Sequence, residues 1–278
     1  MANLFPETQP SMPGLRPKDQ RRAKSWLLVL SCLSGTPALA DTVRYEEAIA
    51  RSPGQTVALY RERHWTRYEG SRASERLVLY LCPDGTPFGR KRVDYRLSAQ
   101  APAFDFTDAR SGYREGLRRS AGAAWVWFRE AGAAERSALI NAPRLVVDAG
   151  FDPFIRNNWQ ALLADQTVTL SFALPSRLKS LDFKLRRVAQ TTAAGETAQV
   201  FRLSLDGWLG LIAPAIDVAY SQKSQRLLRF EGISNLRDDT GRKQLEARID
   251  FPAHDQPASD ADWRGAESLP LASCRVRG

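Results

Sequence analysis

Histidine, methionine and cysteine are scarce in this chain, with 2 His, 2 Met and 3 Cys among 278 residues. A zinc site needs three or four His, Cys or acidic ligands at workable spacing, which His64, His254 and the distant cysteines do not supply. The sequence also lacks a G-x-S-x-G nucleophile motif, a phosphate loop and a dinucleotide fingerprint. We therefore expect no metal, no cofactor and no enzymatic activity. A hydrolase without a recognisable motif is the less favoured alternative.

Long hydrophobic runs are absent as well. The apolar stretch 26–33 is too short to span a bilayer as a helix, and no later segment reaches that length. It follows the basic segment 21–24 and precedes Ala38-Leu39-Ala40, a small-x-small cleavage site. These are the three parts of a secretory signal in order. We expect a signal peptide over residues 1–40, cleavage near Ala40, a periplasmic location and no transmembrane segment in the mature chain.

Three alternatives for the leader stay open. Met12 is a second candidate start, which would give a leader of conventional length. Arg21-Arg22 could belong to a twin-arginine signal, although Lys24 and Ser25 stand where apolar residues are wanted. Cys32 faintly resembles the cysteine of a lipoprotein box, and lipoprotein anchoring there is the minor alternative to cleavage near Ala40.

Two cysteines, Cys82 and Cys274, remain after the leader, which is an even number in an oxidising compartment. Cys82 ends an apolar strand, and Cys274 lies in the tail 252–278, which is rich in Pro, Ala, Ser and Asp. We expect a disulfide between them that pins an otherwise loose tail to a single β-rich domain over residues 41–251. The alternative is two unpaired thiols.

The formal net charge is +9, and residues 1–40 hold five Lys/Arg and two acids, so the remainder carries +6. An excess of this size suits acidic lipid headgroups or polyanions. The plainer reading is a generally arginine-rich surface. Export argues against nucleic acid as a partner.

Apolar and polar residues alternate cleanly in several segments, which predicts strands with one dry and one wet face. The alternating apolar residues are Val168, Leu170, Phe172 and Leu174, then Leu181, Phe183 and Leu185, then Leu245, Ala247, Ile249 and Phe251. Two other segments, 77–82 and 124–128, are apolar on both faces, so something must cover the second face of the sheet.

The longest helix is predicted over residues 152–164. Asp152 is a suitable N-cap, Pro153 fits the first turn, and Phe154, Ile155, Trp159, Leu162 and Leu163 form one apolar stripe. We expect a short helix over 42–51 and a second covering element over 208–213. The pattern of roughly eleven or twelve strands without a βαβ rhythm predicts a mainly β fold. Its form would be one large curved antiparallel sheet, a half-barrel or incomplete barrel, with a helix packed on the concave face.

Two stretches resemble segments of uncharacterised exported proteins of Gram-negative bacteria. One runs from Gly150 to Trp159 (GFDPFIRNNW) and the other from Leu227 to Leu236 (LLRFEGISNL). The resemblance implies the half-barrel of periplasmic lipoprotein carriers and related lipid-binding domains. It implies no catalytic residues.

The candidate ligand site is apolar. Trp125 and Trp127 point to one face of a central strand and could line a cavity for acyl chains on the concave face. The other expected lining residues are Phe154, Trp159, Leu170 and Phe172. This favours a periplasmic, non-enzymatic binding protein for a lipid or other hydrophobic ligand. The alternative for these side chains is a closed core.

A second candidate site is basic. Arg61, Arg63 and Arg67 share a strand face with Trp65, and such a face suits an anionic partner. The competing function is therefore an envelope structural or interaction protein that engages an acidic component. On the opposite face of the same strand, His64 lies beside Glu62, and we expect a hydrogen-bonded histidine there.

Overall fold

The computed structural model describes residues 41–120, 122–207 and 214–276. The predicted signal peptide and the predicted covering element at 208–213 lie outside the described residues. No helix in the described part of the chain is both long and apolar enough to cross a membrane.

The described residues contain sixteen strands, more than the sequence pattern predicted, and all belong to one sheet. The strands are β1 (Thr42–Arg51), β2 (Ala58–Glu69), β3 (Arg72–Leu81), β4 (Pro87–Asp94), β5 (Ala103–Asp108), β6 (Tyr113–Ser120), β7 (Ala123–Arg129), β8 (Arg136–Ile140), β9 (Leu145–Val146), β10 (Val168–Leu174), β11 (Lys179–Ala193), β12 (Glu196–Leu205), β13 (Ile216–Ser221), β14 (Leu227–Arg237), β15 (Gln244–Asp250) and β16 (Gln256–Ala258). The helical elements are η1 (Asp148–Gly150), α1 (Phe151–Asn157), α2 (Trp159–Leu163), η2 (Pro175–Arg177) and α3 (Asp260–Ser268).

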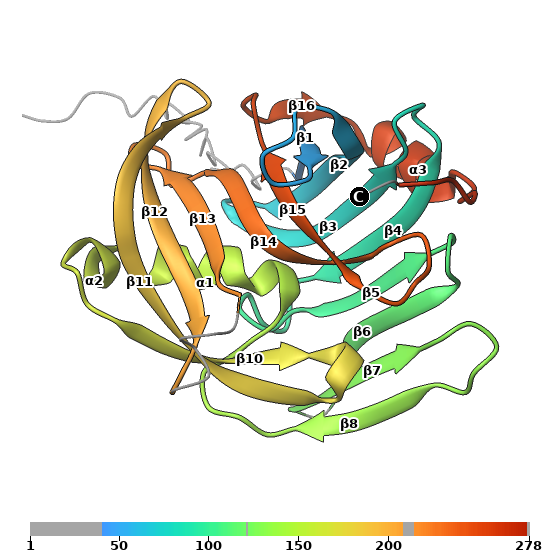
Figure 1. Cartoon of the computed structure of the whole chain (residues 1–278), viewed down its shortest axis with the longest axis horizontal. Coiled ribbons are helices and arrows are strands. Elements are labelled where there is room, and N and C mark those ends of the chain that lie inside the picture. Colours follow the sequence, from blue (N-terminus) through green and yellow to red (C-terminus); the bar gives the residue numbers. More distant parts are fainter. Residues whose placement is uncertain (1–40, 121, 208–213, 277–278) are drawn as a thin grey trace, which may run out of the picture. The chain divides into compact units, whose positions relative to one another are not determined.

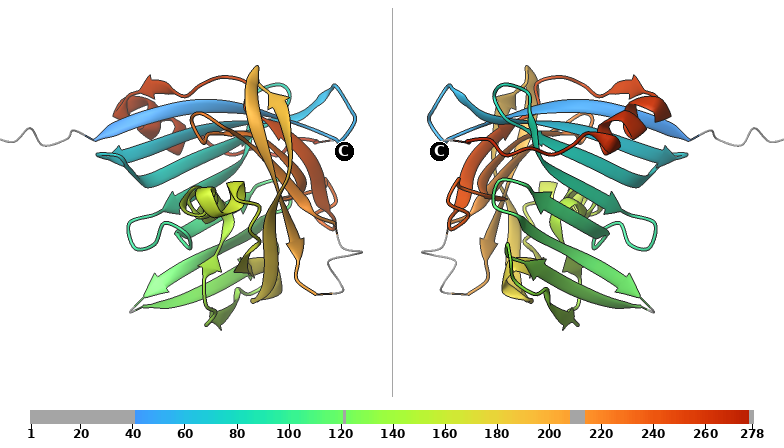
Figure 2. Two further views of the ribbon diagram at one scale, coloured as in Figure 1. Left: turned by 90° about the vertical axis from the view of Figure 1, so that its left-hand side faces the viewer. Right: turned by 90° about the vertical axis from the view of Figure 1, so that its right-hand side faces the viewer.

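The sheet is a meander in two arms. Strands β1 to β8 follow one another antiparallel, β10 to β15 do the same, and β1 pairs with β15 to join the arms. The sheet ends at β8 and β9, so it does not close into a barrel. It curves strongly, and η2 at the end of β10 lies against β6 and β7 (Figures 1 and 2). The mainly β, incomplete-barrel architecture predicted from the sequence is confirmed.

Strand register follows the alternation of the sequence. In the β10–β11 pair, Leu170 lies opposite Phe183 and Phe172 opposite Leu181. A shift by one residue would turn each apolar set to the other face, so burial fixes this register. The predicted strands over 168–174, 181–185 and 245–251 are therefore confirmed.

The segment 42–51, predicted as a helix, is strand β1. It pairs with β2 along its whole length and with β15 at its end, from Ile49 to Arg51. Its position between the two arms gives it hydrogen-bond partners on both edges, and such tertiary pairing outweighs a weak local helix preference.

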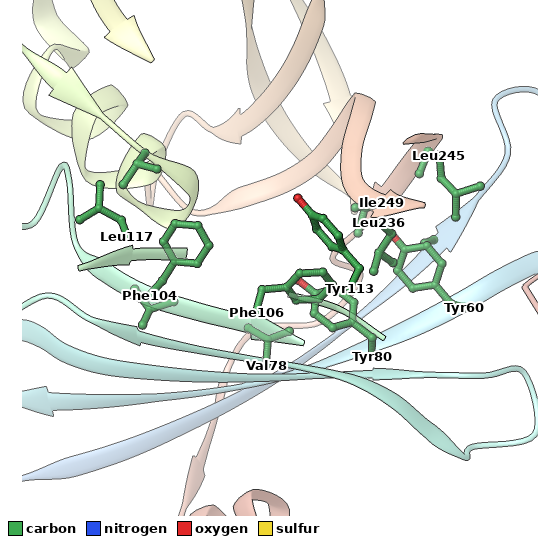
Figure 3. Packing of buried hydrophobic residues seen from close by; sticks show 14 of the residues in the cluster. Tyr60, Val78, Tyr80, Phe104, Phe106, Tyr113, Leu117, Leu236, Leu245 and Ile249 are labelled. Carbon is green, nitrogen blue, oxygen red and sulfur yellow. The ribbon is translucent and has the colours of Figure 1, made fainter. Parts of the chain in front are cut away.

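The concave face carries the main core. Tyr60, Val78, Tyr80, Phe106 and Tyr113 belong to a cluster contributed by successive strands and by β14 and β15 across the bend (Figure 3). A second cluster surrounds α1 and α2, where Trp159 packs edge-on against Phe201 with ring centroids 5.3 Å apart. A helical segment on the concave face is thus confirmed.

The predicted continuous helix 152–164 is divided into α1 and α2. Asn158 lies between them at φ −105° and ψ 12°, and its side-chain amide donates to the carbonyl of Phe154. A side chain that bonds the carbonyl four residues back in this way destabilises and often bends a helix. Asp152 is not the N-cap, because the helix begins at Phe151 and is preceded by Gly150. Four residues of the predicted apolar stripe are buried, namely Phe154, Ile155, Trp159 and Leu162, whereas the fifth, Leu163, is only partly buried.

The C-terminal tail is ordered rather than loose. Cys82 and Cys274 form the predicted disulfide, 192 residues apart in sequence, with Cα atoms 6.5 Å apart. Within the tail, β16 pairs with β1, and α3 begins at a capping box made by Ser259 and Asp262. This box has Asp at the position where the common motif has Glu, so the sequence pattern did not indicate it.

Helix α3 covers the convex face of the sheet. Trp263 and Ala266 pack on Trp65 and on Leu77, Leu79 and Leu81. The alternate residues of β3, Val78 and Tyr80, belong to the concave core. This explains why the segment 77–82 is apolar on both faces.

Candidate binding cavity

A cavity of about 550 Å³ lies on the concave side, between the sheet and α1. Ligand sites usually measure about 300–1,000 Å³. Most of the wall is apolar, because the inward positions of the alternating strands β10 to β15 meet there. The apolar lining includes Phe151, Phe172, Leu181, Phe183, Leu203, Leu205, Ile216, Val218, Leu227, Phe230, Ile233, Ile249 and Phe251.

One part of the wall is charged. It consists of inward-facing residues of β2, β3, β4 and β6 together with η1 and α1, namely Glu62, His64, Arg76, Lys91, Glu115, Asp148 and Asp152. The cavity is therefore amphipathic, with a long apolar region and a region of ionisable groups.

Lys91 and Asp148 form a buried ion pair in this charged region. Nζ of Lys91 donates to both carboxylate oxygens of Asp148, at 2.7 and 2.9 Å, and both side chains are close to nine-tenths buried. Asp148 has a left-handed backbone at φ 45°, which Asp tolerates better than most residues. The backbone amide of Ala149 also donates to Asp148, so the carboxylate is held from two sides.

Glu62 and His64 form a second buried pair, two residues apart on β2. Nε2 of His64 lies 2.8 Å from Oε2 of Glu62, which confirms the expected hydrogen-bonded histidine. Nδ1 of His64 is buried without a hydrogen-bond partner among the described residues. The imidazole thus keeps one buried nitrogen whose hydrogen bond is not made within the described residues.

Glu115 carries a perturbed carboxyl group. Burial raises its pKa to about 7, although the hydroxyl of Tyr113 donates to it at 2.7 Å and favours the ionised form. Burial also raises the pKa of the Tyr80 hydroxyl well above its usual value. This part of the wall therefore holds a carboxyl group whose pKa lies far above its ordinary value and a phenol that stays protonated at neutral pH.

Arg76 differs from the other buried charges of the wall. Its Nε donates to the hydroxyl of Thr66 at 3.1 Å, but its guanidinium forms no ion pair with any carboxylate in the described part of the chain. Burial disfavours its charge, yet attraction to Tyr95, Glu46 and Asp152 outweighs burial and raises the pKa. Arg76 is thus a half-buried, permanently charged cation that faces the cavity.

Only some of the residues predicted to contact a ligand line the cavity. Phe172 lines the cavity, whereas Phe154, Trp159 and Leu170 lie in the core between the helices and the sheet. The helix reaches the cavity through Phe151 instead.

Trp125 and Trp127 do share one face of β7, but it is not the concave face. Ala124, Val126 and Phe128 of the same strand belong to the concave core. Because side chains alternate along a strand, both tryptophans point to the opposite side. Trp125 is 42% exposed. The prediction that the two tryptophans line the cavity is wrong. Strand β7 is apolar on both faces, so the large size of the tryptophan side chains does not show which face is concave.

Trp127 is buried on this outer face among arginines. The guanidinium carbon of Arg118 lies 4.3 Å from the ring centroid, and that of Arg114 lies 5.6 Å away. Gly116 on the neighbouring strand leaves the space that the indole occupies. Trp127 therefore has a packing role that is separate from the cavity.

The predicted anionic-partner face, formed by Arg61, Arg63, Trp65 and Arg67, lies on the convex side of β2. Trp65 is buried beneath α3. Arg67 pairs with Glu75 and Asp260, and Arg63 pairs with Glu47. Much of this face is thus engaged by the chain itself, while Arg61 and Arg63 stay exposed.

The charged wall of the cavity was not predicted from the sequence. Arg76 precedes Val78 and Tyr80 at the inward spacing of two, and Glu62 and His64 hold the same relation on β2. That spacing is the signal that could have identified them. In the residues that the structure describes, no group of three or more His, Cys, Asp or Glu is arranged to hold a metal ion.

No family model matches the chain, and no curated protein matches it. Among solved structures, it is similar to a β-barrel-like protein of the domain of unknown function DUF1849 from Brucella abortus. The identity is 6% over 80% of this chain and 99% of that chain, with a TM-score of 0.47.

Proposed function

We propose that this protein is an exported, non-enzymatic binding protein of the periplasm that holds a lipid or another ligand with an alkyl chain in the concave cavity. The observation that supports this most directly is the cavity itself, because about 550 Å³ bounded mainly by Phe, Leu, Ile and Val side chains suits an apolar ligand. The signal-like N-terminal sequence supports export.

The arrangement of the wall also supports binding. A closed core would fill the concave face with side chains, whereas Phe172, Phe183, Ile216 and Phe230 are only partly buried although they face inward. Covering such apolar surface with a ligand contributes roughly 25 cal/mol per Å².

The test is the binding of the uncharged fluorophore N-phenyl-1-naphthylamine, whose emission rises in an apolar site. We expect the purified protein to bind it saturably and aliphatic chains to displace it. Leu181→Trp adds bulk to a residue that lines the cavity and should weaken binding by about tenfold or more. Leu97→Trp is the matched control, since Leu97 is 75% exposed and outside the cavity.

Native mass spectrometry after gentle extraction gives an independent readout. We expect a co-purified mass in the wild-type protein and its loss in Leu181→Trp. If the wild-type protein shows a clean unliganded mass and no saturable binding of the fluorophore, the proposal is rejected.

A further inference from the structure

The charges that line the cavity are mostly neutralised within the chain. Lys91 pairs with Asp148, and Asp152 pairs with Arg156 of the next helical turn. Glu62 contacts His64, and Glu115 is hydrogen-bonded to Tyr113. Each of these carboxyl groups thus has a polar partner inside the protein.

Arg76 is the exception inside the cavity. Glu46 and Asp152 attract its guanidinium from a distance, but neither forms an ion pair with it, and Glu46 does not line the cavity. The other lining cations without an ion pair in the described part of the chain are Arg177 and Lys179, which are exposed to solvent. Arg76 is therefore the one inward, half-buried cation of the described wall that lacks a carboxylate contact.

A guanidinium in this position favours an anion. Partial burial removes water from the charge, and an anion in direct contact would add to the longer-range attraction that Glu46 and Asp152 already supply. The planar fork of arginine binds carboxylate or phosphate oxygens with two parallel hydrogen bonds, which gives both strength and orientation. Thr66 accepts from Nε and helps to fix the side chain.

We propose that the cavity takes a single-chain amphiphile with an acidic headgroup, a carboxylate or a phosphate, whose oxygens bind Arg76 while its alkyl chain lies along the apolar wall. This inference rests on the proposed function and names the class of ligand. It places the headgroup near β2, β3 and α1 and the chain toward β10 to β14.

The experiment compares dodecanoate, dodecyl phosphate and dodecanol as displacers of N-phenyl-1-naphthylamine. The three share one alkyl chain and differ in the headgroup. We expect the wild-type protein to prefer an acidic ligand over dodecanol by about tenfold or more, in line with a charge-assisted hydrogen bond. The acid that binds more tightly identifies the headgroup as carboxylate or phosphate.

Two variants assign the preference to a residue. Arg76→Gln should remove the preference for the acids and leave the affinity for dodecanol within about twofold, while Arg76→Lys should keep part of it. Arg177→Gln is the matched control, because it removes an exposed cation that lines the same cavity. It should leave the preference unchanged.

The outcomes are distinct. Equal affinity of the wild-type protein for acids and dodecanol overturns the inference and leaves the proposed function standing. Loss of the preference in Arg177→Gln but not in Arg76→Gln also overturns it. If the wild-type protein binds neither the fluorophore nor any of the three ligands, the proposed function itself is rejected. The wild-type comparison decides the headgroup even if Arg76→Gln fails to fold.

Discussion

Nζ of Lys91 lies 2.7 Å from Oδ2 of Asp148, and this contact ties the middle of β4 to η1 at the start of the helical segment. The two residues are 57 positions apart in sequence. The pair therefore holds α1 over the concave face while it forms part of the charged wall of the cavity.

Replacing one partner of this pair should be costly. Lys91→Met leaves the Asp148 carboxylate buried without its cation, which typically lowers the free energy of unfolding by about 3–5 kcal/mol. The double variant Lys91→Met/Asp148→Asn should recover part of the loss, because Asn is neutral and tolerates the left-handed backbone. Urea unfolding followed by circular dichroism measures both.

Arg92→Met provides the control for that experiment. Arg92 follows Lys91 on the opposite face of β4 and pairs with Glu267, and those two side chains are 49% and 40% exposed. Its loss should lower the free energy of unfolding by less than about 1 kcal/mol. Equal losses in Lys91→Met and Arg92→Met would show that the buried pair has no special role.

Glu115 should make stability depend on pH. Its pKa is about 7 in the folded protein against an ordinary value of 4.5, so the folded state binds more protons between these values. Stability must then fall as pH rises through this window, and the full effect is on the order of 3 kcal/mol. Glu115→Gln lacks this titration.

The measurement is the free energy of unfolding of both proteins from pH 4.5 to above pH 7. We expect the free energy of unfolding of Glu115→Gln, relative to that of the wild-type protein, to increase steadily as pH rises. This difference should level off above the pKa of Glu115 in the folded protein. A difference that does not vary with pH would contradict the raised pKa.

The sequence predicted those strands in which apolar and polar residues alternate, because one face of each is buried and the other is exposed. The alternation of Leu170 and Phe172 with polar neighbours fixes strand, face and register together, and the structure confirms all three. In β7, by contrast, Trp125 and Val126 are both apolar, so no polar face marks the outside. The orientation of that strand depends on its place in the sheet.

The charged cavity wall was hidden for a different reason. Arg76 and Lys91 are residue types usually found in solvent, and only tertiary structure places them inward. Helix α3 was missed because its few apolar residues, chiefly Trp263, gain their burial from contacts with distant strands. In both cases the deciding interactions are long-range.

Removing the disulfide should free the end of the tail but not α3. Cys82→Ala/Cys274→Ala is expected to lower the free energy of unfolding by about 2–5 kcal/mol. Helix α3 has its own anchors, because Trp263 packs under the guanidinium of Arg67 at 4.5 Å and Asp260 pairs with Arg67. Limited trypsin digestion with intact-mass analysis should show faster cleavage at Arg275 and continued protection at Arg264.

The wild-type protein treated with a reducing agent is the control for that digestion, and it should reproduce the pattern of the double variant. Equally fast cleavage at Arg264 and Arg275 would mean that the disulfide, rather than the packing of Trp263, holds α3 on the sheet.

Two glycines should respond to alanine with opposite signs. At Gly116, a Cβ would run into the backbone carbonyl of Phe104 on the neighbouring strand and would lie 2.7 Å from Nε1 of Trp127. The backbone oxygen cannot move without disturbing the β5–β6 pairing, so Gly116→Ala should lower the free energy of unfolding by about 1–3 kcal/mol.

At Gly265, inside α3, nothing lies within 4 Å of the added atom. Gly265→Ala should therefore raise stability by about 0.5–1 kcal/mol, because alanine restricts the unfolded chain and favours the helix. Urea unfolding of the two variants side by side measures both effects. A Gly116→Ala variant as stable as the wild-type protein would contradict the packing of Trp127 over Gly116, and a destabilised Gly265→Ala variant would contradict the open space at Gly265.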